Sequence, residues 1–410
     1  MCKKGACDTV KICMIAHFTD TPNEKGNNRF KYLANMLSEN HDVTVVTTSF
    51  SHTTKTQREE NDMTDVKYSL QMCHEPGYGK NVSLSRIRSH KVFAENVKQY
   101  LEKAEKPDVI YCAVPSLDVA YVAAQYAKKH GVKFIIDVQD LWPEAFQMVL
   151  PIPLVGKVLF YPWKRKADEI YASADEIVAV SQIYADRAMK VNENCKEAHV
   201  VYLGTDLDTF DSFAQGDAPF QKEEGKLYLG YCGTLGASYD IPCVLSALEI
   251  LKNRGESTPK FIVLGDGPQK SAFEAMAQEK GLDVLFTGRL PYDEMCRYLV
   301  SCDMLVNPIV KGAAQSIINK HADYAATGKA VVNTQECPEY RTLVERYQCG
   351  LNCAVGSAED VANAIKTLME DDSLRTRMGQ NARKMAEELF HRKKTYKRIE
   401  TLFSSEQAKV

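Results

Sequence analysis

Several features that would define other classes of protein are missing from this sequence of 410 residues. No stretch approaches the ~20 consecutive apolar residues that a membrane-spanning helix needs. The formal net charge is only -3, so the chain as a whole is not built to coat nucleic acid, and any anion site must be local. The N-terminal stretch lacks the pattern of a signal peptide. We therefore expect a cytoplasmic protein, with contact to the inner face of the cytoplasmic membrane left open.

Metal and hydride-transfer chemistry also lack their usual signatures. The 13 cysteines include no C-x-x-C pair, and no cysteine–histidine cluster has zinc spacing. Several cysteines lie in apolar runs, which is typical of small buried side chains in a reducing compartment. The first expected strand is followed by HFTDTPNEKGNN, which contains only Gly26 and not the fingerprint G-x-G-x-x-G. We therefore expect no metal and no hydride-transfer cofactor.

What the chain does contain is a regular alternation of short β-branched runs with helical periods. VKICMIA, PDVIYCAV and VKFIIDV are typical of strands, and helical patterns separate them. This alternation predicts βαβ units and parallel sheets. A polar stretch at 211–226 separates a second series of the same kind. The predicted fold class is α/β, with Rossmann-like doubly wound domains at 1–210 and 211–385 that face each other across a cleft.

Glycines follow three strands of the second series, in the segments CGTLG, VLGDGP and FTGRL. A glycine lets the backbone approach a phosphate closely, although one glycine after a strand is usually only a turn. Three strand ends of one sheet that open on the same side are a stronger signal. The candidate residues are Gly233, Thr234, Gly265, Gly288, Arg289 and Leu290.

The segment QSIINKHADYAATGK, residues 315–329, predicts a helix behind the next strand of that sheet. Ser316 is the expected N-cap, which leaves the N–H groups of Ile317 and Ile318 free to bind an anion. Lys320 adds a positive charge one turn inside, and a carboxylate at Asp323 suits a vicinal diol such as that of a ribose. The alternative is a surface helix with a weak Lys–Asp pair three residues apart.

At this point the sequence resembles a known family, the retaining glycosyltransferases of family 4, which have the GT-B fold. The resemblance runs roughly from Lys11 to Phe403. The matching segments are KGNNRFKYLANML, DVQDLWPEAF, SADEIVAVS, YLGTDLDTF, CGTLG, VLGDGP, FTGRL and SIINKHADYAATGKAVV. The form D-x-x-D-L-W-P-E is similar to a subgroup that builds bacterial surface polysaccharides such as capsules. In this fold the C-terminal helix, here 386–410, crosses back to the N-terminal domain.

The sequence departs from the family pattern at several positions. The usual pair of glutamates eight residues apart falls at Gln315 and Asp323, and the usual histidine of the DVQD segment is Gln139. The arginine and lysine that normally grip the donor phosphates are missing from CGTLGASYD. We expect Lys320 and Arg289 to replace them. DVQD is spaced D-x-x-D and lies in the expected acceptor domain, so it is not interpreted as a metal site.

The resemblance implies a hexosyl- or glycosyltransferase that is retaining and metal-independent. It would move a sugar from a nucleotide-diphosphate sugar, expected to be a UDP-sugar, to a glycan or polyprenyl-linked saccharide, with no nucleic-acid partner. The implied catalytic residues are Asp140, Lys320 and Asp323. The implied donor-binding residues are Gly233, Thr234, Gly265, Gly288, Arg289, Leu290, Gln315, Ser316, Ile317, Ile318, Lys320 and Asp323. The implied acceptor-binding residues are Gly26, Asn27, Arg29, Asp140, Trp142 and Glu144.

Two basic stretches indicate further contacts. The segment 148–171 combines aliphatic and aromatic residues with a basic rim, a composition typical of membrane interfaces. Its candidate membrane contacts are Phe160, Tyr161, Trp163, Lys164 and Arg165. The alternative is a buried connector with a solvated basic end. The segment SRIRSHKVF, with Arg86, Arg88, His90 and Lys91, either faces an anionic acceptor or is a solvated helix face.

Two rival functions fit the same twin-Rossmann fold. A nucleotide-sugar 2-epimerase would need carboxylates and histidines clustered in the site to move a proton, and only His321 and Asp323 lie near each other in the relevant segment. A nucleotide-sugar-binding partner protein with weakened catalysis would fit the glutamines at 139 and 315. Incubation with nucleotide-sugars alone separates these possibilities.

Overall fold

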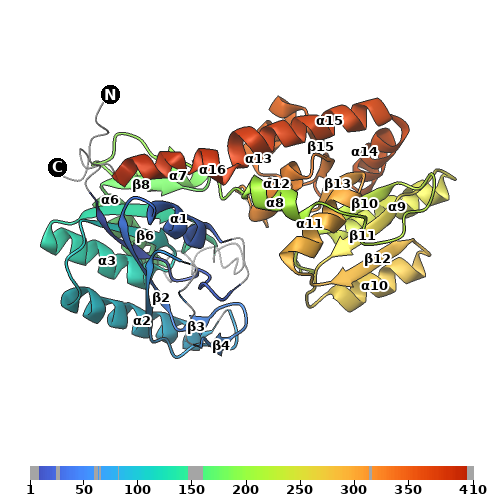
Figure 1. Ribbon diagram of the computed structural model, residues 1–410. Coiled ribbons are helices and arrows are strands. Elements are labelled where there is room, and N and C mark those ends of the chain that lie inside the picture. Colours follow the sequence, from blue (N-terminus) through green and yellow to red (C-terminus); the bar gives the residue numbers. More distant parts are fainter. Residues whose placement is uncertain are drawn as a thin grey trace, which may run out of the picture. The chain divides into compact units, whose positions relative to one another are not determined.

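The computed structural model describes residues 9–24, 28–59, 63, 66–81, 83–145, 160–313 and 316–403, and Figure 1 labels its elements. The chain forms two compact units. Unit 1 comprises Met1–Val201 together with Tyr396–Val410, and unit 2 comprises Tyr202–Thr395. The sequence placed the divisions near residues 210 and 385, whereas the units divide at 201 and 395. Among the described residues, no helix is both long and apolar enough to cross a membrane.

Unit 1 is built on a parallel seven-stranded sheet. Its strand order is β5 (Ser69–Cys73), β2 (Asp42–Thr48), β1 (Lys11–Ile15), β6 (Val109–Val114), β7 (Lys133–Val138), β8 (Glu176–Ala179) and β9 (His199–Val200). A hairpin of β3 (Phe50–Ser51) and β4 (Thr56–Gln57) follows β2. The helices are α1 (Arg29–Leu37), α2 (Leu84–Lys103), α3 (Leu117–His130), α6 (Tyr161–Ser173) and α7 (Gln182–Met189). The strand order reverses between β1 and β6, which makes the carboxyl ends of these two strands the topological switch point.

Both faces of this sheet are covered, as the apolar strands predicted. Along β1, Cys13 and Ile15 belong to the core that contains α2 and α3, while Ile12 and Met14 belong to the core that contains α1. Successive strand residues point to opposite faces, so a doubly covered strand needs apolar side chains at consecutive positions. Nine of the eleven described cysteines are buried, and all eleven are free thiols.

The C-terminal segment completes the second of these cores. Tyr396, Ile399, Leu402 and Phe403 are fully buried against α1 and strands β1, β2 and β6. The segment comprises the short helix α17 (Lys397–Glu400) and a 3₁₀ turn (Thr401–Phe403). Lys133 Nζ also donates to the carbonyl of Leu402 at 3.0 Å. This second core of unit 1 is therefore built from segments that lie far apart in the sequence.

Unit 2 repeats the architecture with a parallel six-stranded sheet. Its strand order is β12 (Val284–Gly288), β11 (Lys260–Leu264), β10 (Tyr228–Cys232), β13 (Met304–Asn307), β14 (Ala330–Asn333) and β15 (Gly350–Asn352). Its helices are α8 (Leu207–Phe213), α9 (Ile241–Asn253), α10 (Lys270–Glu279), α11 (Tyr292–Ser301), α12 (Asn319–Ala326), α13 (Pro338–Tyr347), α14 (Ala358–Glu370), α15 (Asp372–Met385) and α16 (Arg392–Thr395). The switch point of unit 2 lies between β10 and β13.

The end of the chain is not the one long helix that the sequence predicted. After α15 comes a π-helical turn, Ala386–Phe390, and the helix then breaks at His391, whose backbone is extended. Thr205 explains the break: its N–H donates to the carbonyl of Phe390 at 2.8 Å, and its carbonyl accepts from the N–H of Arg392 at 3.1 Å. The two segments that join the units are thus bonded to each other within unit 2.

Candidate functional site

The carboxyl ends of β10, β11 and β12 surround a cavity of about 660 Å³ in unit 2. Its lining residues are Cys232, Gly233, Thr234, Leu264, Gly265, Asp266, Gly267, Arg289, Leu290 and Met295. Five of the predicted donor residues are among them, and the sixth glycine-segment residue, Gly288, accepts from the N–H of Gly265 at 2.9 Å. The three glycine segments therefore meet, as the parallel sheet requires.

Backbone packs directly on backbone in these turns, which is why the positions are glycines. Gly265 has φ +146°, and a Cβ there would lie 1.8 Å from the carbonyl oxygen of Gly233. A Cβ at Gly267 would lie 2.3 Å from the carbonyl oxygen of Leu235. Such contacts are far shorter than van der Waals distance. The shape of the cavity therefore depends on glycine, which has no side chain, at these positions.

Replacing Gly265 with alanine is expected to damage the cavity, while the same change at Gly236 is not. At Gly236 the nearest atom to an added Cβ is Thr234 Cγ2, at an ordinary 3.7 Å. We expect Gly265→Ala to lower the free energy of unfolding by about 1–3 kcal/mol, the usual cost of overpacking, and to weaken nucleotide binding. Urea unfolding and calorimetric titration with UDP measure both effects. If the two variants bind UDP with equal affinity, the cavity is not part of the nucleotide site.

Lys320, on α12, brings an enclosed positive charge to this cavity. Its Nζ has no hydrogen-bond partner among the described residues and lies over the rings of Tyr231 (4.4 Å) and Tyr239 (4.1 Å). It lies 2.9 Å from the position that a Cβ would take at Gly233. Burial lowers the pKa of Lys320 to about 7. The surface Lys–Asp pair considered from the sequence is absent from the described residues, and the enclosed amine has no anionic partner there.

Asp323 is held by a partner that sequence analysis missed. The hydroxyl of Tyr292 donates to Asp323 Oδ1 at 2.8 Å and shares a second hydrogen bond with Thr205 Oγ1 at 2.9 Å. Burial raises the pKa of Asp323 to about 6, against the opposing effect of the hydrogen bonds from Tyr292 and Thr205. The Asp323 carboxylate is therefore fixed in orientation and linked to the segment that joins the units.

The start of α12 differs from the sequence prediction. The N-cap is Ile318, not Ser316, and the N–H of Ile318 is not free because it donates to His321 Nδ1 at 3.3 Å. Ser316 is buried, and its carbonyl accepts from Gln335 Nε2 at 2.9 Å. A buried polar network that includes Gln335 and His321 overrides the local preference of serine for the N-cap. Ile317 is buried, and Gln315 lies outside the described residues.

On unit 1, the predicted acceptor carboxylates are engaged with neighbouring donors. Asp140 accepts from the N–H of Leu141 at 2.9 Å and from Trp142 Nε1 at 3.1 Å, and burial raises its pKa. Glu144 pairs with Arg187 Nε at 2.6 Å. Gly26 and Asn27 lie outside the described residues. The structure thus places Asp140 and Trp142 together directly after β7, with the Asp140 carboxylate held rigidly.

Arg29 is a correction to the predicted acceptor set. Its side chain is buried, and its Nε donates to Asp137 Oδ2 at 2.7 Å while Nη1 donates to the carbonyl of Val201 at 3.0 Å. The guanidinium also lies over the ring of Tyr396 at 4.8 Å. A buried and fully engaged guanidinium is not available to a ligand. Arg29 instead ties α1, β7 and the C-terminal segment together.

Comparison with known proteins agrees with this geometry. The family model described as Glycosyltransferase Family 4 matches residues 26–209, and the model described as Glycosyl transferases group 1 matches residues 214–385. The chain belongs to glycosyltransferase family 4. Its two Rossmann-like units are those of the GT-B fold. The epimerase alternative finds no support in these family matches.

Individual relatives of this chain are distant. It is 23% identical over 249 residues to the uncharacterized glycosyltransferase MJ1069 of Methanocaldococcus jannaschii, a match covering 60% of the chain and 63% of the relative. It is 23% identical over 254 residues to WcaI of Escherichia coli K12, which is named for colanic acid biosynthesis. This match covers 59% of the chain and 61% of the relative. The chain therefore matches less than two thirds of the length of either. A crystal structure of Anabaena Alr3699/HepE with UDP-glucose superimposes with a TM-score of 0.67 at 16% identity. The superposition covers 96% of this chain and 99% of that structure.

The described part of the predicted membrane segment is only partly exposed. Phe160 is 6% exposed and packs on Trp163, which in turn packs against the core of unit 1, so both point inward. Tyr161 is 62% exposed. Lys164 and Arg165 are exposed but paired with Asp168 and Glu169 one turn later, which reduces their net attraction for anionic lipid. Phe160 as a membrane contact is therefore wrong, and residues 148–159 lie outside the described chain.

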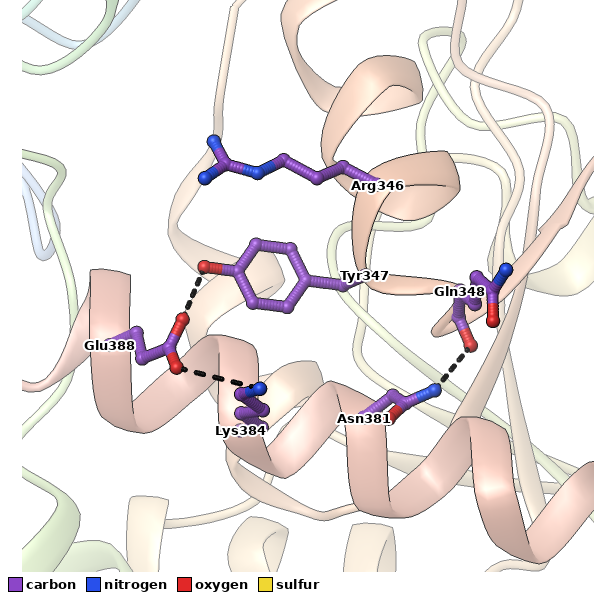
Figure 2. A pocket seen from close by; sticks show the side chains of 6 residues that line it. All are labelled: Arg346, Tyr347, Gln348, Asn381, Lys384 and Glu388. Atoms are coloured by element: carbon purple, nitrogen blue, oxygen red, sulfur yellow. Dashed lines mark hydrogen bonds and ion pairs between the residues drawn. The ribbon is translucent and has the colours of Figure 1, made fainter.

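A second, smaller cavity in unit 2 lies away from the predicted donor residues. It has a volume of about 360 Å³ and lies between α13 and the α15 region of unit 2 (Figure 2). Figure 2 shows Glu388 between Tyr347, which donates to it at 2.7 Å, and Lys384, which lies 3.9 Å away. Asn381 Nδ2 donates to the carbonyl of Gln348 at 3.2 Å. These contacts join the two elements, and we assign the cavity a structural role.

Proposed function

We propose that this chain is a retaining glycosyltransferase that moves a sugar from a UDP-sugar to a glycan or polyprenyl-linked saccharide in cell-surface polysaccharide synthesis. The observation that carries the proposal is the glycine-lined cavity at the carboxyl ends of β10, β11 and β12 in unit 2, with the enclosed and unpaired amine of Lys320 against it. The complex of Alr3699/HepE with UDP-glucose and the name of WcaI support the choice of donor and pathway.

In this proposal the donor lies across the three glycine segments. The diphosphate contacts the backbone of Gly233 and Gly265, and Lys320 neutralises its charge. The base and ribose contact Arg289, Leu290 and Asp323. Placing a cation and backbone N–H groups where charge develops on the departing nucleoside diphosphate lowers the barrier to its departure. The proposal requires no metal, because Lys320 and backbone dipoles supply the positive charge.

The acceptor side of the proposal rests on Asp140 and Trp142. A carboxyl whose pKa is raised by burial is a stronger proton acceptor than one in water, which suits a role near the attacking hydroxyl. In a retaining transfer the hydroxyl attacks from the face that the nucleotide leaves, so no protein nucleophile is needed. Donor and acceptor must be held at near-attack distance for this to occur.

The epimerase alternative conflicts with the chemistry of unit 2. Among the described residues that line the donor cavity, Asp266 is the one carboxylate. His321 is fully buried, and its pKa lies well below the usual value because burial and the Lys320 cation oppose its protonation. It is bonded to the Ile318 N–H and lies 3.2 Å from Asn307 Nδ2, so it is not positioned to move a substrate proton.

Incubation of the full chain with a panel of nucleotide-sugars tests the proposal. We expect slow hydrolysis of one UDP-sugar, with release of UDP and of a sugar that first appears as the donor's anomer in NMR spectra. In EDTA the rate of hydrolysis is expected to stay within about twofold of the untreated rate. The Lys320→Ala variant is expected to show no hydrolysis. Appearance of an epimer would support the rival function. Complete loss of activity in EDTA with recovery in magnesium would refute metal independence.

A further inference from the structure

Aromatic and cationic side chains gather at the carboxyl edge of the unit 1 sheet, among residues that the donor and acceptor assignments above largely leave unused. They come from the segments after β1, β5 and β7, from the turn of the β3–β4 hairpin, and from α2. We call this group the Arg86 cluster. Its members are Phe18, His52, Lys55, Tyr78, Arg86, His90 and Trp142.

Arg86 occupies the centre of the cluster and has only neutral partners. Its guanidinium lies 4.9 Å from the ring of Trp142, 5.4 Å from Tyr78 and 5.8 Å from Phe18. Nη1 donates to the carbonyl of Asn81 at 2.8 Å, and Nε donates to His90 Nε2 at 3.4 Å. Among the described residues no carboxylate pairs with it. A planar guanidinium in this state presents a fork that matches a carboxylate or phosphate.

Lys55 adds a second cation with the same property. Its Nζ donates to Asn81 Oδ1 at 2.7 Å and lies 4.7 Å from the ring of Tyr78. Within the described parts of the chain it too has no carboxylate partner. Lys55 and Arg86 are both partly exposed, as are Phe18 and Trp142, so the cluster is open to a ligand. Burial, and next the charges of Lys55 and Arg86, lower the pKa of His52 to about 4. Both cations therefore lie close to this part of the cluster.

Glu75, a carboxylate beneath the cluster, is already satisfied. It lies 2.8 Å from His17 Nε2, and it accepts from Thr48 Oγ1 at 2.6 Å and Ser89 Oγ at 2.7 Å. Burial alone would raise its pKa, but these hydrogen bonds and the charge of His17 hold the pKa at about 2. The ligand atoms of His17, Glu75 and His90 lie within 4.8 Å of one another. These existing bonds and the two adjacent cations disfavour a metal ion there.

An independent observation marks the same edge as a binding region. His17 follows β1 and Ser116 follows β6, the two strands that flank the switch point. His17 Nδ1 and Ser116 Oγ are both enclosed, and neither has a hydrogen-bond partner in the described structure. Buried polar atoms are rarely left unpaired, and open α/β sheets bind ligands at this point.

We infer that the Arg86 cluster binds an anionic group carried by the acceptor saccharide. Arg86 and Lys55 hold a phosphate or carboxylate, and the rings of Trp142 and Phe18 pack on the apolar face of the sugar. The inference rests on the proposed function, because it names the class of acceptor that the transfer uses. A sugar phosphate of a lipid-linked acceptor and the carboxylate of a uronic acid offer the same chemistry to the guanidinium.

Tryptophan fluorescence gives a direct test, because the chain has only two tryptophans, Trp142 and Trp163. In a Trp163→Phe background the signal reports Trp142 alone. The probes are glucose 1-phosphate, methyl glucuronide, methyl glucoside and inorganic phosphate. We expect one or both charged sugars to bind and to identify the source of the anion, and methyl glucoside to bind at least tenfold more weakly.

Variants of α2 decide whether Arg86 is responsible. Arg86→Gln is expected to weaken the charged sugar roughly tenfold or more, Arg86→Lys less, and Lys98→Gln, which removes an exposed charge from the same helix, not at all. Calorimetric titration with UDP is expected to be unchanged in all three. If the unmodified protein does not bind UDP, the result would count against the proposed function rather than against the Arg86 cluster. Equal binding of methyl glucoside, equal binding of inorganic phosphate alone, or binding that requires zinc would each overturn the inference.

Discussion

Affinity for a UDP-sugar is expected to be greatest near pH 6.5 and to fall on both sides. The optimum lies midway between the pKa of Asp323, which burial raises to about 6, and that of Lys320, which burial lowers to about 7. Below pH 6 Asp323 becomes protonated and loses its strength as an acceptor for ribose hydroxyls. Above pH 7 Lys320 loses the charge that attracts the diphosphate. On each side of the optimum, the acidic limb and the alkaline limb of the profile, the affinity falls by at most tenfold per pH unit.

Single substitutions should remove one limb each. Lys320→Ala is expected to abolish the alkaline limb and to weaken binding at pH 6.5 by roughly 10- to 150-fold, the equivalent of about 1.5–3 kcal/mol for a hydrogen bond to a charged group. Asp323→Asn is expected to abolish the acidic limb and to cost less, because the amide still accepts a hydrogen bond. Gly236→Ala serves as the matched variant that keeps both limbs.

Calorimetric titration with a UDP-sugar from pH 5 to 9 measures the profile. UDP itself is a poor probe because its terminal phosphate ionises near pH 6, within the same window. Repeating the titration at pH 8 in two buffers with different ionisation enthalpies counts protons. We expect uptake of up to one proton as Lys320 becomes charged. A flat profile with no proton uptake would place the diphosphate away from Lys320.

The same buried amine is expected to cost stability. Its pKa in the folded chain lies below the unfolded value of 10.5, so the unfolded state binds more protons and stability rises with pH between about 7 and 10.5. Below pH 7 the folded protein carries the full penalty of a buried, unpaired cation. Lys320→Met is therefore expected to unfold at a higher temperature than the native chain at pH 6.5 while it loses donor binding. A residue that weakens the fold in this way is typical of a functional site.

Sequence alone predicted that the three glycine segments of unit 2 meet, because their signals are local. A glycine placed directly after an apolar strand is visible in a few letters, and parallel strands bring such ends together at one edge. Gly233, Gly265 and Arg289 were found in this way and line one cavity. The helical pattern of residues 315–329 supplied Lys320 and Asp323. The structure shows Lys320 unpaired among the described residues and Asp323 bonded to Tyr292.

What sequence could not show were the contacts between distant residues. Tyr292 and Asp323 are 31 positions apart, and Arg29 and Asp137 are 108 apart, so neither pair leaves a periodic signal. Arg29 was assigned to the acceptor site through the family resemblance, which carries no information on its buried partner Asp137. Ser316 was misread for the related reason that tertiary contacts override a local capping preference. The Arg86 cluster likewise needs five separate segments to be assembled.

Ending the chain at Thr395 is expected to unfold unit 1 and to leave unit 2 folded. The deletion removes Tyr396, Ile399, Leu402 and Phe403, four fully buried side chains of the unit 1 core. Burial of each contributes about 1.5–3 kcal/mol, so their joint loss is comparable to the whole stability of a domain, about 5–15 kcal/mol. Thr395 is the correct end point because the preceding segment, including buried Phe390, belongs to unit 2.

A chain that ends at Phe403 is the matched control, since it keeps all four core side chains. We expect it to unfold like the full chain and to catalyse transfer, whereas the chain that ends at Thr395 loses one thermal transition and all transfer. UDP should still bind to the shorter chain, because the proposed donor cavity and Lys320 lie within Tyr202–Thr395. Bound at a hundred times its dissociation constant, UDP should stabilise the remaining transition by about 2.7 kcal/mol. A chain ending at Thr395 that keeps both transitions would show that the C-terminal segment is dispensable for the core it completes.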